Sequence, residues 1–389
     1  MLAVLAEDWK NGGFGLYIHW PFCQAKCPYC DFNSHVSRTV DQALWRDCLL
    51  AELDRVGAKT QGRVLNSIFF GGGTPSLMDP ETVAALIDRA AHIWPRANDM
   101  EVTLEANPTS VEAGRFAAYR QGGVNRVSMG IQALNDADLR RLGRMHSVAE
   151  ARAAFDIARH EFERVSFDLI YARQDQTLPD WESELTEALA MAIDHLSLYQ
   201  LTIETGTAFG DRYSKGKLRG LPHDDVAADM YQRTGEICAA AGLEGYEVSN
   251  YARPGSESRH NQIYWRYGDY AGIGPGAHGR LTLNGQRYAT EQWRNPMRWL
   301  EAAQSNSAQS VCNPISLEDQ ADEMMMMGLR LNEGVDLSRW EKLSDRALDK
   351  ERLAYLTEIG MLRIDNGRLY ASQDGRMVLN TLLAEILVD

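Results

Sequence analysis

Short apolar segments alternate with amphipathic segments along the first 200 residues of the chain. The apolar segments have the length of buried strands, and we expect strands at 16–20, 67–70, 101–106, 126–129, 165–170 and 195–200. The segments between them have helical spacing and predict helices at 40–56, 80–94, 111–121, 147–160 and 178–192. This α/β alternation predicts a parallel sheet, either an open doubly wound sheet or a full or partial (β/α) barrel.

The pattern changes in the second half of the chain. A helix at 224–241 and a sheet-like segment at 245–252 precede a polar stretch at 300–315, which we interpret as a linker. Beyond it we expect helices at 318–331 and 344–359, a hairpin of 361–364 and 368–371 with an Asn-Gly turn, and a last helix at 375–387. We therefore predict a core domain at 1–300 and a small winged-helix-like module at 315–389.

Composition and charge limit the partners and the cellular location that we expect for this protein. The chain has 389 residues and a net charge of −14, which repels phosphate backbones and argues against nucleic acid as a partner. The winged-helix-like module is itself acidic, with nine Lys and Arg against fifteen Asp and Glu. The N-terminal residues lack the features of a signal peptide, and no apolar run is long enough to span a membrane. We therefore expect a cytoplasmic protein.

Three of the six cysteines, Cys23, Cys27 and Cys30, lie in one short loop that directly follows the first predicted strand. Three thiolates do not complete a tetrahedral zinc site without a distant fourth ligand. A four-iron cubane can use three thiolates and leave one iron open to chelate a small molecule. The alternative is a structural zinc site or a chance grouping. The other three cysteines, Cys48, Cys238 and Cys312, are expected to be ordinary buried thiols.

Further candidate residues follow the predicted strands. The turn Gly71–Pro75 directly follows the second strand, and its glycines allow backbone to approach a ligand closely. Glu105, Gln132 and Asp168 lie at or near the ends of three later strands, where parallel barrels keep their sites. Arg144 could pair with a carboxylate. Each of these residues alone could instead be a satisfied buried polar group or a solvated charge.

The Cys-x3-Cys-x2-Cys spacing is the signature of radical S-adenosylmethionine proteins. Together with Tyr17–Cys23, Gly71–Ser76, Ser128–Gln132 and Phe167–Tyr171, the chain resembles the oxygen-independent coproporphyrinogen III oxidase family over nearly its whole length. The resemblance implies a partial (β/α)6 barrel, a [4Fe–4S] cluster on Cys23, Cys27 and Cys30, and bound S-adenosylmethionine. The residues that it implies for S-adenosylmethionine are Tyr17, Gly73, Thr74, Pro75, Glu105, Gln132, Arg144 and Asp168.

Two branches of this family are distinguished by short motifs. The oxidases, radical decarboxylases of porphyrin biosynthesis, carry a further cysteine two residues after the third, where this chain has Phe32. They also have a longer arm before the cluster. The heme-chaperone branch instead has Cys-Asp-Phe and a His-Asn-x-x-Tyr-Trp motif, which matches His260–Trp265 here. The sequence thus favours a heme chaperone without oxidase activity, and the oxidase is the alternative function.

The resemblance to heme chaperones implies heme as a cofactor and partner. Its expected ligands are His260, Asn261, Tyr264 and Trp265, because an imidazole can bind heme iron and aromatic rings can cover a porphyrin. A structural hydrogen-bonded role is the alternative for His260. His278 is a weaker candidate for heme, and His19 is expected to order the cysteine loop. The resemblance also implies heme-acceptor proteins, including respiratory proteins at the inner membrane face. Oligomeric state stays open, with a homodimer as one alternative.

Overall fold

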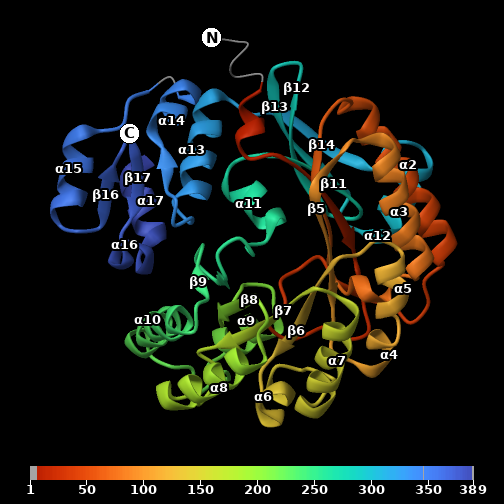
Figure 1. Ribbon diagram of the computed structural model, residues 1–389, viewed down its shortest axis with the longest axis horizontal. Coiled ribbons are helices and arrows are strands. Elements are labelled where there is room, and N and C mark those ends of the chain that lie inside the picture. Colours follow the sequence, from red (N-terminus) through yellow and green to blue (C-terminus); the bar gives the residue numbers. More distant parts are fainter. Residues whose placement is uncertain (1–6, 345, 388–389) are drawn as a thin grey trace.

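The computed structural model describes residues 7–344 and 346–387 (Figure 1). The predicted domain ranges 1–300 and 315–389 also include residues 1–6, 345 and 388–389, which lie outside the described residues. None of the described helices is long and apolar enough to cross a membrane.

Six parallel strands form the centre of the molecule. They are β1 (Phe14–Trp20), β4 (Leu65–Gly72), β5 (Arg96–Ala106), β6 (Arg126–Gln132), β7 (Arg164–Tyr171) and β8 (His195–Gln200). These strands are neighbours in the order of the chain, without the reversal of strand order that defines a doubly wound sheet. Because β1 and β8 do not pair with each other, the barrel stays open. The predicted partial (β/α)6 barrel is confirmed.

Helices cover the outside of these strands (Figure 1). They are α2 (Gln42–Lys59), α3 (Pro80–Ile93), α4 (Ser110–Ala113), α5 (Phe116–Gln121), α6 (Asp136–Arg141), α7 (Val148–Glu161), α8 (Leu178–Met191) and α10 (Asp224–Ala240). The predicted helix at 111–121 is interrupted between α4 and α5, and the short α6 was not predicted. Alternate strand residues point to opposite faces, so Leu16 and Ile18 join the core under the helices while Tyr17 faces the interior.

Both edges of the parallel sheet are extended by strands. On the side of β1 follow the parallel strand β11 (Asp269–Ile273) and the antiparallel strands β12 (His278–Leu283), β13 (Gln286–Gln292) and β14 (Gln309–Pro314). On the side of β8 follow the short antiparallel strands β10 (Asn250–Ala252) and β9 (Glu244–Gly245).

The prediction of a linker at 300–315 is wrong. Its residues form the end of α12 (Pro296–Gln304) and the edge strand β14, which pairs with β13. An edge strand is held by its backbone hydrogen bonds on one side and exposes polar side chains, so its sequence resembles a linker. The prediction that the three single cysteines are buried is wrong for one of them, which lies on this edge strand. Cys48 and Cys238 are buried, but Cys312 lies on β14 and is exposed.

The C-terminal module has a hydrophobic core of its own. Its elements are α13 (Leu317–Gly328), β15 (Val335–Asp336), α14 (Leu337–Leu343), α15 (Lys350–Glu358), β16 (Leu362–Asp365), β17 (Arg368–Ala371), α16 (Gln373–Met377) and α17 (Leu379–Leu387). The predicted hairpin is present as β16 and β17, and Asn366 and Gly367 at its turn both have positive φ. Met324 and Met325 pack into this core, whereas Met326 is exposed.

A short helix, α11 (Arg259–Trp265), packs against β1, β4 and β11. Its N-terminus lies at the carboxylate of Glu101, which accepts hydrogen bonds from the Ser258 hydroxyl and the His260 backbone N–H at 3.4 Å. The same carboxylate pairs with Arg164 at 2.8 Å and lies 4.0 Å from Arg126. Because these groups belong to β5, β6 and β7, one buried ionic network joins the helix to the inner face of the barrel.

A second buried ionic cluster holds the antiparallel extension, and it gives a test of the fold. Asp269 is fully buried, lies 2.6 Å from Arg63 and 3.6 Å from Arg287, and accepts a hydrogen bond from Thr282. We expect Asp269→Ala to lower the free energy of unfolding by about 3–5 kcal/mol, because it leaves buried arginines unpaired. Chemical denaturation measures this loss. The matched control is Asp54→Ala, which breaks an exposed pair with Arg89 and should cost much less, because solvent screens that pair. Equal effects would contradict the assignment.

Candidate functional site

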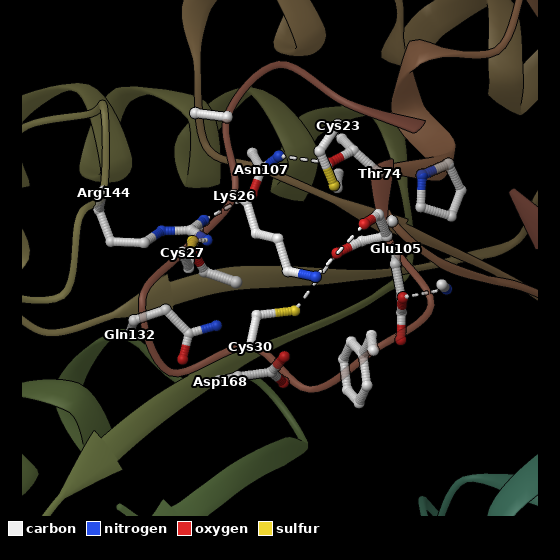
Figure 2. Close-up of a pocket in the computed structure, with 18 of the residues that line it drawn as sticks. Cys23, Lys26, Cys27, Cys30, Thr74, Glu105, Asn107, Gln132, Arg144 and Asp168 are labelled. Atoms are coloured by element: carbon white, nitrogen blue, oxygen red, sulfur yellow. Dashed lines mark hydrogen bonds between the residues drawn. The ribbon is translucent and has the colours of Figure 1, made fainter. Parts of the chain in front are cut away.

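The cysteine loop runs between the two-residue strands β2 (Phe22–Cys23) and β3 (His35–Val36), directly after β1. Cys23, Cys27 and Cys30 all line a cavity of about 140 Å³ (Figure 2). Each sulfur has a polar neighbour, from this loop, from the end of β4 or from the segment between α6 and α7. Thr74 Oγ1 donates to Cys23 Sγ at 3.5 Å, Arg144 Nη1 donates to Cys27 Sγ at 3.5 Å, and Ser34 Oγ lies 3.6 Å from Cys30 Sγ.

The arrangement of the three cysteines distinguishes a cluster from a single metal ion. Within residues 7–344 and 346–387, no group of three or more His, Cys, Asp or Glu side chains is placed to hold one metal ion. The three thiols nevertheless face one cavity. A zinc ion needs its ligands gathered around one point, whereas a cubane binds each thiolate to a different iron. Three thiols on one cavity are the ligand set that a cubane cluster needs.

The glycine turn after β4 forms one wall of the cavity. Gly72 has a φ of +114°, and its N–H donates to Glu105 Oε2 at 3.2 Å. A Cβ atom on Gly73 would lie 2.7 Å from the Phe22 carbonyl oxygen, so no side chain fits there without moving backbone. Glycine at this position lets the turn pack directly on the backbone that leads into Cys23, and Gly72 and Gly73 line the cavity with backbone atoms.

Two carboxyl groups contribute to the same cavity. Glu105 is the second-last residue of β5 and Asp168 lies in β7. Both line the cavity together with Ser128, which donates to Asp168 at 3.3 Å. Burial, reinforced by the nearby Asp168 charge, raises the pKa of Glu105 to about 8. Burial also raises the pKa of Asp168 to about 6. A pair of carboxyls with raised pKa values favours a cationic ligand, whose charge would replace the missing solvation.

A cationic side chain lies beside the cysteine loop. Arg144 donates to Asn107 Oδ1 at 2.5 Å and to the Gly130 carbonyl at 2.7 Å, but its buried Nε has no hydrogen-bond partner among the described residues. Because the Arg144 side chain also lines the cavity, its guanidinium is suited to an anionic group such as a carboxylate. Gln132 lines the same cavity with a φ of +74°, a strained conformation of the kind that often marks a functional site.

Most of the predicted ligand residues converge on this cavity. Those that line it are Gly73, Thr74, Pro75, Glu105, Gln132, Arg144 and Asp168. Tyr17 does not line it. Its hydroxyl lies 2.9 Å from His19 Nδ1, and its side chain lines a neighbouring cavity. Sequence reasoning missed Asn107, which donates to Thr74 Oγ1 at 3.1 Å and accepts from Arg144. Its place directly after the strand predicted at 101–106 was an available signal.

The His260 motif lies on α11. His260 is buried, its Nδ1 lies 3.0 Å from Ser67 Oγ, and its Nε2 lies 2.9 Å from the Tyr264 hydroxyl. Its ring stacks on Phe69 at 4.7 Å between centroids. Burial, with a smaller effect of the Arg126 charge, lowers the pKa of His260 to about 3. Both ring nitrogens are thus engaged, and binding of heme iron would require Tyr264 to move.

The other motif residues are divided between different surroundings. Asn261 Nδ2 donates to the Tyr246 hydroxyl at 3.3 Å, which is a structural contact. Trp265 lines a different cavity, beside Met324 and Leu331, and the Arg330 guanidinium lies 5.4 Å from its ring centroid. Only Tyr264 reaches the neighbouring cavity that Tyr17 lines. The motif therefore does not form one continuous surface for a porphyrin, and its predicted heme contacts stay a prediction.

Comparisons with known proteins place this site in a family. The Radical SAM superfamily matches residues 17–188, and the HemN C-terminal domain matches residues 315–378. The heme chaperone HemW of Escherichia coli is 38% identical over 385 residues, which cover 96% of this chain and 98% of that protein. The chain belongs to the HemW family of radical S-adenosylmethionine proteins.

Other relatives agree with this assignment. The HemW of Haemophilus influenzae is 37% identical to this chain, and the match covers 98% of that protein. The mitochondrial radical S-adenosyl methionine domain-containing protein 1 of Bos taurus is 39% identical, and the match covers 87% of that protein. Among solved structures, coproporphyrinogen III oxidase (HemN) of E. coli matches with a TM-score of 0.80 over 97% of this chain and 92% of that chain. The two chains are 21% identical, so this likeness shows a shared fold and no more.

The raised pKa of Glu105 predicts a pH dependence of stability. The native carboxyl keeps its proton up to about pH 8, whereas an unfolded glutamate ionises near 4.5. The native state thus binds more protons between these values, and the free energy of unfolding falls as pH rises from about 4.5 to about 8. Glu105→Gln, which mimics the protonated form, should remove part of this fall.

Denaturation at the two ends of this pH range, for the wild type and the variant, gives the comparison. Glu150→Gln is the matched control. The Ser147 hydrogen bonds lower the pKa of Glu150, so its titration lies below the range. The control should lose as much stability with rising pH as the wild type. An equal loss in Glu105→Gln would show that Glu105 titrates normally in the native protein.

Proposed function

We propose that Cys23, Cys27 and Cys30 hold a [4Fe–4S] cluster and that S-adenosylmethionine binds beside it. The observation that carries this proposal is the cavity itself, which combines three thiols, an open glycine turn, two carboxyls and an arginine with an unpaired donor. When bound, the cluster and S-adenosylmethionine together supply one-electron chemistry. The protein's own contribution is to bind, orient and neutralise charge.

Each wall of the cavity is suited to one part of S-adenosylmethionine. The Gly72–Thr74 backbone and the Glu105 carboxyl lie on one wall, where they can bind the ligand's ammonium and sulfonium charges. Arg144 lies beside Cys27 and lines the cavity, where its guanidinium can bind the ligand's carboxylate. Asp168 and Gln132 add hydrogen-bonding groups to the same cavity.

We further propose that the chain is a heme chaperone that delivers heme to acceptor proteins. The support is its similarity to proteins named heme chaperone HemW, over nearly the whole length of both chains. The likeness to coproporphyrinogen III oxidase is one of fold. At the position of the oxidases' further cysteine the chain has Phe32, which is 60% exposed and lines the cysteine cavity without offering a thiol.

The acceptors and the place of delivery belong to the same proposal. Respiratory heme proteins at the inner membrane face are the acceptors that we propose. The chain would then work as a cytoplasmic protein that contacts a membrane protein from one side.

The first test of this function is the iron content. Anaerobic reconstitution should give about four irons and four sulfides per chain, since three thiolates can hold a cubane. Cys23→Ala, Cys27→Ala and Cys30→Ala should each abolish the cluster. Cys312→Ala and the buried Cys48→Ala are matched controls that should retain it, because these thiols lie outside the cavity. Loss of iron in the controls but not in the loop variants would refute the assignment.

The second test separates chaperone from oxidase. The reconstituted protein should bind about one heme per chain and should not convert coproporphyrinogen III to protoporphyrinogen IX when given reductant and S-adenosylmethionine. The physical reason is the missing thiol at Phe32. Anaerobic heme titration and product chromatography measure the two properties. Repeated turnover of coproporphyrinogen without heme binding would favour the oxidase.

A further inference from the structure

A second cavity, of about 370 Å³, adjoins the cysteine cavity. The two share Phe32, Gly72 and Glu105 as a common wall. The volume lies in the range of cavities that bind small organic ligands. On its far side the cavity is lined by Tyr264 and Tyr270, whose rings lie 4.2 Å apart between centroids. These two rings, together with Tyr17 and Phe32, give the cavity an aromatic lining.

Two histidines line this cavity, and they differ in what their rings contact. His19 is buried, with Nδ1 2.9 Å from the Tyr17 hydroxyl and Nε2 3.0 Å from the Asn33 carbonyl oxygen. His278 is 58% exposed, and no hydrogen bond to its ring is found among the described residues. His278 is thus the cavity imidazole that can accept a ligand without breaking an existing contact.

The backbone before His278 fixes its position at the cavity. His278 is the first residue of β12 and follows a glycine turn, in which Gly274 and Gly276 have positive φ. A Cβ atom on Gly274 would lie 2.2 Å from the His19 carbonyl oxygen, so the turn packs directly on the end of β1. The imidazole is therefore held by backbone packing next to the strand that leads into the cysteine loop.

A carboxylate lies behind this imidazole. Glu291 Oε1 on β13 is 3.7 Å from His278 Nδ1. Histidines that bind metals commonly donate their second ring N–H to a carboxylate, which orients the ring and leaves the other nitrogen for the metal. At 3.7 Å the two groups are beyond hydrogen-bond distance, but a small rotation of either exposed side chain would bring Nδ1 to Glu291 and leave Nε2 of His278 for a metal. Arg294 also lines the cavity and is exposed, so it can pair with an acidic substituent of the ligand.

We infer that this cavity is the heme site and that His278, rather than His260, binds the heme iron, with Glu291 as a positioning residue. The inference rests on the proposed heme-chaperone function. An iron tetrapyrrole matches the lining of this cavity: aromatic side chains for a flat ring, an imidazole without a hydrogen-bond partner among the described residues for iron, and a cation for a propionate. Tyr264 brings the His-Asn-x-x-Tyr-Trp segment to this cavity, while His260 supports α11 from within.

The test is a heme titration of the reconstituted protein, with four variants compared by absorption spectrum and affinity. His278→Ala should weaken heme binding by roughly tenfold or more and change the Soret band, and added free imidazole should restore the band. Glu291→Gln should keep heme but alter the reduction potential of the iron. His260→Ala should keep the wild-type spectrum and melt at a lower temperature. His92→Ala, an exposed histidine outside the cavity, is the matched control.

The outcomes separate the inference from the function on which it rests. A wild type that binds no heme would overturn the chaperone function itself. A wild type that binds heme, with His278→Ala unchanged in affinity and spectrum, would overturn this inference alone. So would a His260→Ala variant that folds like the wild type but loses the wild-type spectrum. Restoration of the His278→Ala spectrum by imidazole, and not by an equal concentration of salt, would support it.

Discussion

The interior of the barrel depends on one buried carboxylate, that of Glu101. It pairs with Arg164, lies near Arg126, and accepts hydrogen bonds at the N-terminus of α11. A buried charge is costly unless every partner is in place, so the network is satisfied in only one arrangement of β5, β6, β7 and α11. The anion also lies where the dipole of a helix N-terminus favours it. Through this contact α11 is fixed inside an open barrel.

The cavity of the cysteine loop and the helix α11 differ in how far the sequence predicts them. The cavity of the cysteine loop was largely predictable, because parallel strands carry their functional side chains at one common end. Glu105 and Asp168 converge with the cysteines for that reason. The orientation of His260 was not predictable, because a motif names residue types and not the face that a helix presents. Its burial follows from the Glu101 contact and from the Ser67 hydroxyl, both distant in sequence.

The same limit explains the error at the edge of the sheet. A strand between two others is recognisable from its apolar residues, as 165–170 shows. The edge strand β14 has one neighbour and a polar, exposed surface, so its backbone pairing with β13 leaves no signal in the hydrophobic pattern. The cysteine on it, Cys312, is exposed for the same reason. Both errors arise where backbone hydrogen bonds, and not side-chain burial, decide the structure.

The two cavities are physically linked because Glu105 belongs to both. Burial keeps its carboxyl protonated near neutral pH, and a cation bound on the cysteine side would favour the ionised form. Ionisation changes the charge that faces the second cavity, whose walls include Tyr264 and His278. Such coupling is reciprocal, so a ligand in the second cavity changes the affinity of the first by the same factor. Glu105 is therefore the residue through which ligands in the two cavities would affect each other.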